Sequence, residues 1–487
     1  MIKIKIESHA SDKANVHALF FVKKSVQFSS VLSPEGEEQV ENVLTEIEKG
    51  ISDDLDIMVI DGHATIFVNA AKERGISSLD HLRMAGYRLG LRVQKKQFKM
   101  VKLLLADAAD EQFKAILHGL YYSDYSFEKY KSKPKKTVEP IYEIEAQDRA
   151  KDFEKIAHEV AIEQECLGLC KDLINTPGSD LTPEEFIHVA IRESHRAPDV
   201  SIKIRNDKQL AREGFNGLLT VGKGSRYSPY LVTLSYTPKH AAKDKHLAIV
   251  GKGLTFDTGG ISLKPAKGMN EMQSDMSGAA AALAAICAAA RLKLPIRITA
   301  ILCLAENRIG SKAVLPGDIF KAKNGKTVMV DNTDAEGRLV LSDGLAEAGL
   351  VNATHIIDLA TLTGAMVRAL GYAITGFFAN DDQLAKDIII AGNASSEKFW
   401  PMPLEDEYAD ELKDKFADLT NCGKSSGAIL AALFLREFIP NGVKWAHWDI
   451  AGTAYVTKPW KYTAYGATGI GVQTLIELAR KLGGEEP

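Results

Sequence analysis

Apolar and polar residues repeat with two different periods along this chain, and runs of the two periods follow one another. A repeat of two residues is typical of a strand, and a repeat near 3.6 residues is typical of a helix. Within residues 1–130 the runs alternate: strand-like at 16–22, 56–60 and 99–105, helix-like at 35–49, 78–89 and 109–120. This alternation predicts an α/β domain in the first part of the chain.

The pattern is interrupted at residues 128–136, where five lysines and one proline replace the apolar positions. A charged run with a proline is typical of an exposed linker. One long helical run follows at residues 150–174, and Asn-Thr-Pro-Gly at 175–178 is a strong sequence for ending it. We therefore expect an N-terminal domain with its linker at 1–149, a connecting helix at 150–176 and a C-terminal domain at 177–487.

The C-terminal part opens with a helix start, because Thr182 is a favoured N-cap and Pro183 a favoured first helical residue. Beyond it, strands are expected at 246–250, 298–304, 327–330, 355–359 and 444–450, and helices at 278–292 and 342–348. Such strands are typical of a parallel sheet covered by helices. The expected fold class is α/β, with a smaller N-terminal domain and a larger C-terminal domain around a central, mostly parallel sheet. Ligands should bind where its strands end.

Composition narrows the class of partner. The 487 residues are too many for one ordinary core, and 45% hydrophobic with 25% charged residues fits a globular protein. A net charge of −4 provides no basic surface for nucleic acid or for an anionic membrane. Peptides or small molecules are therefore the expected partners.

Targeting and membrane signals are not expected from this sequence. Residues 1–6 alternate like a strand and lack the apolar run of a signal peptide, and the most apolar helical run, 278–290, is too short to cross a bilayer. The five cysteines are sparse and odd in number, which favours reduced, buried thiols over a disulfide framework. We expect a soluble, cytoplasmic protein with no membrane partner.

Candidate chemistry begins at residues 332–339, where Asp334, Glu336 and Arg338 follow the strand expected at 327–330. Charges of both signs within one turn can point into the same small volume, and Gly337 allows another part of the backbone to approach closely. A solvated turn with a surface ion pair would also explain these residues taken alone.

A second polar stretch, residues 250–276, carries Lys252, Asp257, Lys264 and Asp275. Its Gly-x-Gly follows a strand, but a dinucleotide-binding loop needs a third glycine at a fixed spacing and an immediate helix. If the two stretches meet, four carboxylates lie together and cannot all ionise without compensating charge. Two divalent ions (magnesium, manganese or zinc) bridged by a shared carboxylate would supply that charge. Lys252 can add a nitrogen ligand only when it is unprotonated.

Both stretches closely resemble the signature segments of the leucine aminopeptidase (cytosol aminopeptidase) family. The resemblance covers residues 165–475 and includes the segments at 175–177, 181–183, 305–307, 316–318, 358–364 and 449–453, and more faintly the linker at 125–133. It implies a macro-like N-terminal domain and a catalytic C-terminal domain. It also implies a homohexamer that removes N-terminal residues from peptides with a free N-terminus.

The resemblance also implies roles for individual residues. One tighter metal ion would be held by Lys252, Asp257, Asp275 and Glu336, and a more exchangeable one by Asp257, Asp334 and Glu336. A water or hydroxide between the metals would attack a peptide bond whose carbonyl is polarised by one metal and Lys264, while the other metal binds the free α-amine. Arg338 would hold a bicarbonate ion that acts as general base, which suits a planar guanidinium. The metals would be manganese or zinc, with magnesium as an alternative.

By the same matching, the pocket for the N-terminal side chain would be lined by Met272, Thr361, Leu362, Gly364 and Ala451. These residues are apolar enough to favour leucine or methionine, although each could equally be ordinary core. The sequence departs from the family at Gln273, where a basic residue is usual, and the loop at 421–428 matches only in part.

Two functions from other classes are compatible with parts of the sequence. A binding or regulatory protein would keep the fold and lose ligands, but every ligand position is filled, and the acidic balance argues against nucleic acid. A two-metal phosphatase or amidohydrolase would share the carboxylates, but no phosphate-binding loop is evident.

Overall fold

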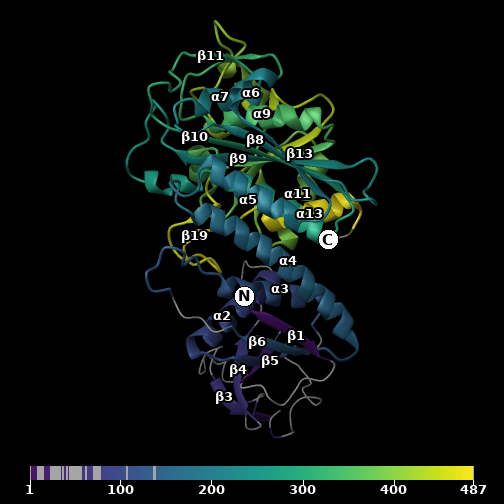
Figure 1. Cartoon of the computed structure of the whole chain (residues 1–487). Helices are drawn as coiled ribbons and strands as arrows, with labels where there is room; N and C mark the ends of the chain where they lie inside the picture. The colour runs from purple at the N-terminus through teal and green to yellow at the C-terminus, as the bar shows by residue number, and fades with distance from the viewer. Residues whose placement is uncertain are drawn as a thin grey trace. The chain divides into compact units, whose positions relative to one another are not determined.

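The chain folds into two compact units, which are shown in Figure 1 as a computed structural model: Met1–Gln164 with Pro459–Ala464, and Glu165–Lys458 with Tyr465–Pro487. The structure describes residues 2–7, 16–21, 57–60, 63–69, 78–105, 108–134 and 139–485, with isolated positions between 35 and 42. The helix expected at 35–49 falls largely outside the described residues. The domain boundaries expected at 149 and 176 stay predictions.

The first unit contains a six-stranded sheet in the order β1-β6-β5-β2-β4-β3. Its strands are β1 Lys3–Glu7, β2 Val16–Phe21, β3 Ile57–Ile60, β4 His63–Asn69, β5 Met100–Leu104 and β6 Ile141–Glu145. All neighbours are parallel except β3 and β4. Helices α2 (Ser78–Lys96) and α3 (Asp110–Asp124) contact each other extensively. Elements α2, β5, α3 and β6 follow one another in the chain, which confirms the expected alternation of strands and helices in this part.

The second unit is built on an eight-stranded sheet in the order β15-β14-β17-β13-β9-β10-β8-β7. Its strands are β7 Val200–Arg205, β8 Tyr230–Tyr236, β9 His246–Asp257, β10 Arg297–Asn307, β13 His355–Ala360, β14 Thr375–Ala379, β15 Phe399–Pro401 and β17 Lys444–Asp449. The four central strands β17, β13, β9 and β10 are parallel, as expected, whereas β8 and β7 are antiparallel additions.

Helices cover both faces of this sheet. The helices of this unit are α5 Pro183–Arg196, α6 Asp207–Glu213, α7 Asn216–Gly222, α8 Ser277–Arg291, α9 Gly337–Leu350, α10 Gly364–Leu370, α11 Asp382–Ala394, α12 Gly427–Arg436 and α13 Val472–Gly483. Helix α4 (Ala150–Asn175) belongs to the first unit up to Gln164 and to the second from Glu165. Helices α5, α11 and α13 lie on one side of the sheet, and α6, α7 and α9 lie on the other (Figure 1). The expected N-cap of α5 is present, since Thr182 Oγ1 accepts from the Glu185 amide at 3.3 Å.

Shorter elements complete the second unit. Strands β11 Ile319–Lys321, β12 Thr327–Met329 and β16 Leu419–Thr420 form a small sheet, β18 Tyr455–Val456 pairs with β19 Gly466–Ala467, and η2 Met269–Ser274 and η3 Asp406–Leu412 are 3₁₀ helices. A further 3₁₀ helix, η1 Gln147–Arg149, precedes α4 in the chain. Among the described residues, no helix is both long and apolar enough to cross a membrane.

The alanine-rich helix α8 packs closely on the sheet because each side of the contact has a glycine, Gly251 on β9 and Gly278 on α8. A Cβ on Gly251 would lie 2.5 Å from Ala279 Cα, and a Cβ on Gly278 would lie 2.0 Å from the carbonyl oxygen of Leu359. No side chain could be accommodated at either position without a shift of the backbone. This close packing brings the segment just before α8, which carries Asp275, beside β9.

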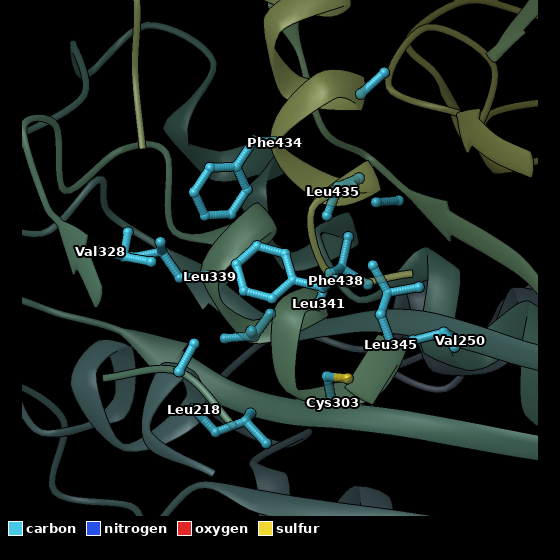
Figure 2. Close-up of a cluster of buried hydrophobic side chains, with 14 of the residues drawn as sticks. Leu218, Val250, Cys303, Val328, Leu339, Leu341, Leu345, Phe434, Leu435 and Phe438 are labelled. Carbon is cyan, nitrogen blue, oxygen red and sulfur yellow. The ribbon is translucent and has the colours of Figure 1, made fainter. Parts of the chain in front are cut away.

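Helix α9 begins five residues earlier than the expected start at Ser342, because it begins at Gly337. Its apolar side enters the main core of the second unit, where Leu339, Leu341 and Leu345 lie among Val250, Cys303 and Phe434 (Figure 2). The burial of these side chains outweighs the low helix propensity of a glycine at the first position. The consequence is that Glu336 and Arg338 are fixed by the start of a buried helix.

Candidate metal centre

Four carboxylates that the sequence singles out converge at the end of strand β9. Asp257 is the last residue of β9, Asp275 precedes α8, and Asp334 and Glu336 lie just before α9. One oxygen each of Asp257, Asp334 and Glu336 lies within 4.8 Å of the other two. All but Asp334 are buried, so this is an interior cluster and the alternative of a solvated surface turn is excluded.

Two lysines contact these carboxylates from opposite ends of the cluster. Lys252 Nζ lies 2.8 Å from Asp275 Oδ1 and 2.9 Å from Glu336 Oε1. Lys264 Nζ lies 2.7 Å from Asp257 Oδ2 and also pairs with Asp334. Each lysine therefore bridges one pair of carboxylates.

Burial and mutual repulsion disfavour the ionised form of the acids. Burial, with the charge of Asp257 next in size, raises the pKa of Glu336 to about 8, and burial raises the pKa of Asp275 to about 6. Burial lowers the pKa of Lys252, but the negative charges of Asp275 and Glu336 raise it by more. The net result is a pKa above the ordinary lysine value. The cluster thus favours extra positive charge.

Two carboxylate oxygens of the cluster have no hydrogen-bond partner among the described residues and could contact a cation. Asp275 Oδ2 and Glu336 Oε2 are buried and have no hydrogen-bond partner. If all four carboxylates are to be ionised, the two ammonium groups that contact them leave two negative charges (4 − 2) to be balanced by a further cation. Oxygen-rich sets of this kind fit hard or borderline divalent cations such as magnesium, manganese and zinc. The residues present therefore fit a divalent metal site.

Asp257 is oriented by a residue to which the sequence analysis gave no role. Asn307 Nδ2 donates to Asp257 Oδ1 at 2.8 Å and to the main-chain oxygen of Thr333 at 3.0 Å. The Gly259 amide donates to the same Asp257 oxygen at 2.8 Å. Asn307 therefore connects β10 with β9 and with the turn before α9. It lies in the segment at 305–307, which the sequence analysis includes in the resemblance to the family.

At Gly337 the turn before α9 lies very close to the side chains of Lys252 and Leu362. A Cβ on this residue would lie 2.9 Å from Lys252 Nζ and 2.9 Å from Leu362 Cδ1. The expected close approach is made by these two side chains and not, as the sequence analysis expected, by another part of the backbone. Any larger residue would push Lys252 or Leu362 out of place.

Arg338 is buried in the first turn of α9 and is only partly satisfied by the protein. Its Nη1 donates to the main-chain oxygen of Asn421 at 2.8 Å, whereas its Nε is buried without a partner. Burial lowers the pKa of Arg338, against the attraction of Cys422, Glu336 and Asp449. A buried guanidinium with an unused N–H group fits the binding of a planar anion.

Asn421 is a second residue, after Asn307, that holds the site in place and was not identified from the sequence. Its Oδ1 accepts from the amides of Asp331 (2.9 Å) and Asn332 (3.2 Å), and its Nδ2 donates to the carbonyls of Asn332 (2.8 Å) and Ala335 (3.3 Å). The side chain is fully buried. These bonds fix the turn that carries Asp334 and Glu336. The neighbouring Cys422 is half-buried, so the expectation that all cysteines are buried is wrong for this one.

The residues predicted to line the substrate pocket occupy three places. Thr361, Leu362 and Gly364 follow β13 and lead into α10, Ala451 follows β17, and Met272 lies on η2. Thr361 meets the carboxylate cluster, since its Oγ1 donates to Asp275 Oδ1 at 2.7 Å and its main-chain oxygen accepts from Lys252 at 3.0 Å. Leu362 lies against Gly337, as described above.

Asp449 links two of these places and was not assigned a role from the sequence. Its Oδ1 accepts from the amides of Leu362 (3.2 Å), Thr363 (3.3 Å) and Ala451 (3.2 Å), and its Oδ2 accepts from Thr363 Oγ1 at 2.6 Å. One buried carboxylate therefore holds the loop after β13 and the loop after β17 in a fixed relation.

Comparison with known proteins gives one family match and many close relatives. Residues 168–476 match the family described as "Cytosol aminopeptidase family, catalytic domain". A probable cytosol aminopeptidase of Leifsonia xyli is 44% identical over 399 residues, which cover 79% of this chain and 79% of the relative. A probable cytosol aminopeptidase of Chlorobaculum tepidum is 44% identical over 384 residues, covering 76% of this chain and 75% of the relative.

Solved structures resemble the whole chain. The bottromycin maturation enzyme BotP in complex with Mn has a TM-score of 0.84 and 31% identity, covering 96% of this chain and 100% of that one. A tomato leucine aminopeptidase mutant has a TM-score of 0.86 and 28% identity, covering 99% of this chain and 97% of that one. The similarity thus extends over both units of the chain.

Proposed function

Because this chain belongs to the cytosol aminopeptidase family and is a metallo-aminopeptidase, we propose that it removes N-terminal residues, preferably leucine or methionine, by a two-metal mechanism. The observation that carries the proposal is the excess of buried carboxylate over ammonium groups at the end of β9. Peptides with a free N-terminus are the substrates. Neither a phosphatase nor a binding protein accounts for this family match.

Two metal positions account for the carboxylate cluster. Lys252, Asp257, Asp275 and Glu336 would hold the tighter ion, and Asp257, Asp334 and Glu336 the more exchangeable one. Manganese or zinc is proposed, with magnesium as an alternative, and the Mn complex of BotP supports manganese. When bound, the ions supply Lewis-acid activation of water and of the scissile carbonyl. Lys252 would have to lose its proton to act as a ligand, which neighbouring dications favour.

Lys264 is proposed as the residue that stabilises charge in the transition state. Its ammonium group already lies 2.7 Å from Asp257 Oδ2, at the border of the cluster, and its side chain is 21% exposed. A cation held in this position can attract the negative charge that develops on the carbonyl oxygen. Metal binding at Asp257 and Asp334 would release Lys264 for this role.

Arg338 is proposed to hold a bicarbonate ion, which supplies the general base. The support is its unused buried Nε and its attachment to Asn421, which fix the guanidinium in place. A lysine could not offer the same planar pair of donors. The proton taken from the attacking water would be accepted next to Arg338.

The preference for leucine or methionine is proposed to come from the loops at 361–364 and 451. Asp449 holds both loops, and Leu362 and the partly buried Met272 provide apolar surface. A pocket with a fixed apolar wall discriminates by the area of side chain that it buries. One missing methylene changes such discrimination by about 1–3 kcal/mol.

Assembly and location are proposed from the family alone. We propose a homohexamer in the cytoplasm, and the names of the curated relatives support the location. All proposed metal, catalytic and pocket residues lie within 177–487, the proposed catalytic domain. The N-terminal domain at 1–149 and the helix at 150–176 would serve assembly.

Hydrolysis of leucyl-p-nitroanilide by the purified protein tests this function. Manganese-loaded protein should cleave the free-amine substrate and should leave its N-acetylated form intact, because an exopeptidase of this kind needs the α-amine. Equal cleavage of both forms would reject the exopeptidase mechanism. Absence of cleavage with manganese, zinc and magnesium would reject the function.

A further inference from the structure

A cavity of about 700 Å³ lies beside the ends of β9 and β10, and it is lined by none of the residues proposed above for metal, bicarbonate or substrate. Its walls come from the segments that follow α4 and α7, from the end of β10, and from Phe256 on β9 and Gln273 on η2. Gln273 is the residue at which the sequence analysis expects a departure from the family, and it lines this cavity.

The cavity shares two strands with the carboxylate cluster but uses different side chains. Phe256 lines the cavity, whereas the next residue, Asp257, points to Lys264 and Asn307. Glu306 lines the cavity, whereas the next residue, Asn307, holds Asp257. The pairing of β9 with β10 is irregular between Ala305 and Asn307, so Phe256 and Glu306 lie at a break in the ladder. The cavity and the proposed metal positions are therefore neighbours that use different side chains of the same strand ends.

Two guanidinium groups of the lining rest on aromatic rings. Arg226 lies 4.6 Å from the ring centroid of Tyr227, and Arg308 lies 5.7 Å from that of Phe256. Arg226 Nη2 also donates to the Tyr227 hydroxyl, and Arg308 Nη1 lies 3.5 Å from Glu306 Oε1, so one nitrogen of each guanidinium has a partner in the protein. A guanidinium carries five N–H donors on three nitrogens, so each arginine has further donors for a ligand. Such groups bind carboxylates in bidentate geometry.

The charge of the lining favours one bound anion. The Glu306 side chain is 3% exposed, its Oε2 accepts from Ser225 Oγ at 2.5 Å, and its Oε1 lies 3.5 Å from Arg308 Nη1. The carboxylate of Glu306 offsets one of the two guanidinium charges (2 − 1), which leaves one positive charge in the lining. A ligand with a single negative charge would balance it.

The size and surface of the cavity favour an organic anion over an inorganic one. Ligand pockets commonly measure about 300–1,000 Å³, whereas one water occupies only about 30 Å³ of liquid. Bicarbonate or phosphate would fill a small part of the space. Phe256, Tyr227 and Ile309 add apolar surface, and Ile309 is 55% exposed.

We propose that this cavity binds a small organic molecule with an apolar body and one carboxylate, which the two arginines recognise. The apolar body would lie against Phe256 and Ile309. A zwitterionic amino acid fits less well, since its ammonium group would restore the charge that the carboxylate balances.

Calorimetric titration of the manganese-loaded protein with N-acetyl-phenylalanine and with its amide tests the proposal. Both probes lack a free α-amine, and only the first carries a carboxylate. We expect saturable binding of the acid and at least about tenfold weaker binding of the amide, because hydrogen bonds to a charged group are among the stronger ones. Equal binding of the two probes, or no binding of the acid, would overturn the proposal.

Variants separate this cavity from the metal centre. Arg226→Ala combined with Arg308→Ala should weaken binding of the acid at least about tenfold while cleavage of leucyl-p-nitroanilide is retained. Arg226→Ala alone, which removes an exposed side chain, should give a smaller loss and serves if the double variant does not fold. Lys223→Ala is the matched control, since Lys223 lies beside the lining loop but pairs with Asp318 at 3.2 Å.

The location of the probe is decided by a third variant. Glu336→Gln should retain binding of N-acetyl-phenylalanine, because Glu336 does not line the cavity. Binding that is lost in Glu336→Gln and kept in the double arginine variant would place the probe at the metal centre and reject the proposal. Because the readout is binding, failure here leaves the proposed peptide hydrolysis untouched, and failure of hydrolysis leaves this test intact.

Discussion

Arg338 donates from Nη1 to the main-chain oxygen of Asn421 at 2.8 Å, so the turn before α9 is tied to the loop at 421–428. The side chain of Asn421 completes this connection through its bonds to Asp331, Asn332 and Ala335. Two carboxylates and the guanidinium proposed for catalysis thus depend on one buried amide. The loop that looked only partly family-like in the sequence is therefore part of the site.

Asn421→Ala should destabilise the protein and slow the reaction. The change leaves the buried main-chain groups that Asn421 bonded unpaired, and each such group costs about 1–3 kcal/mol. We expect a loss of at least about 2 kcal/mol in the free energy of unfolding, measured by urea denaturation, together with a lower kcat. Asn324→Ala is the matched control, because the two bonds of that side chain, to the Glu437 carbonyl and from the Lys326 amide, are exposed. Equal effects of the two changes would contradict the bracing role.

Glu336→Ala should abolish peptide hydrolysis and lower the metal content. Glu336 is shared by both proposed metal positions, so its loss removes a ligand from each. Metal content by atomic emission and hydrolysis of leucyl-p-nitroanilide are the measurements. Asp331→Ala should retain both, since the Asp331 side chain is exposed in the same turn. Full activity of the Glu336 variant would reject the bridging assignment.

Arg338→Ala should reduce turnover and leave the metal content unchanged. A positioned general base contributes about 100-fold to 10,000-fold in rate, so kcat should fall by about 100-fold or more. Arg338→Lys should recover little of this loss, because an ammonium group lacks the planar pair of donors. Loss of metal together with activity would show that Arg338 is structural.

Asp449→Ala should change specificity more than turnover. The loops at 361–364 and 451 would lose their common acceptor, so the pocket should fit leucine less well. We expect a higher KM for leucyl-p-nitroanilide, a smaller leucyl-to-alanyl preference and little change in kcat. Asp449→Asn keeps one acceptor oxygen and should restore the preference in part. An unchanged preference in the alanine variant would contradict the role of Asp449.

Asp343→Asn should remove part of the pH dependence of stability. Burial raises the pKa of Asp343 to about 8, although its Oδ2 accepts from the Leu218 amide at 2.8 Å. Between the ordinary aspartate range and pH 8 the folded state therefore holds a proton that the unfolded state has lost. The free energy of unfolding falls as pH rises through this window. Urea denaturation at pH 5 and pH 8 should show a smaller fall in the variant, and an equal fall would refute this prediction.

The sequence predicted the parts of this structure that depend on local pattern. The parallel strands β9, β10, β13 and β17 lie where continuous apolar runs predicted them, and the charged residues of interest follow those strands. Thr182 caps α5 as its type and position indicate. In each case, neighbours in the chain supply the signal.

Contacts between distant segments could not be predicted in this way. Asn421 lies 83 residues from Arg338, and Asp449 lies 87 residues from Leu362, so neither partner marks the other in the sequence. The start of α9 was placed too late because Gly337 has a low helix propensity, which the buried contacts of Leu339 and Leu341 override. The antiparallel strands β7 and β8 were not predicted, although β7 alternates apolar and polar residues from Val200 to Arg205.

Metal stoichiometry of the activity tests the central claim most directly. Chelated protein should be inactive on leucyl-p-nitroanilide, and titration with manganese should restore activity fully only when two ions are bound per chain. The two ions should differ in affinity, since one proposed position has a ligand more than the other. Full activity with one ion per chain, or in the chelated protein, would contradict the two-metal account of the cluster formed by Lys252, Asp257, Asp275, Asp334 and Glu336.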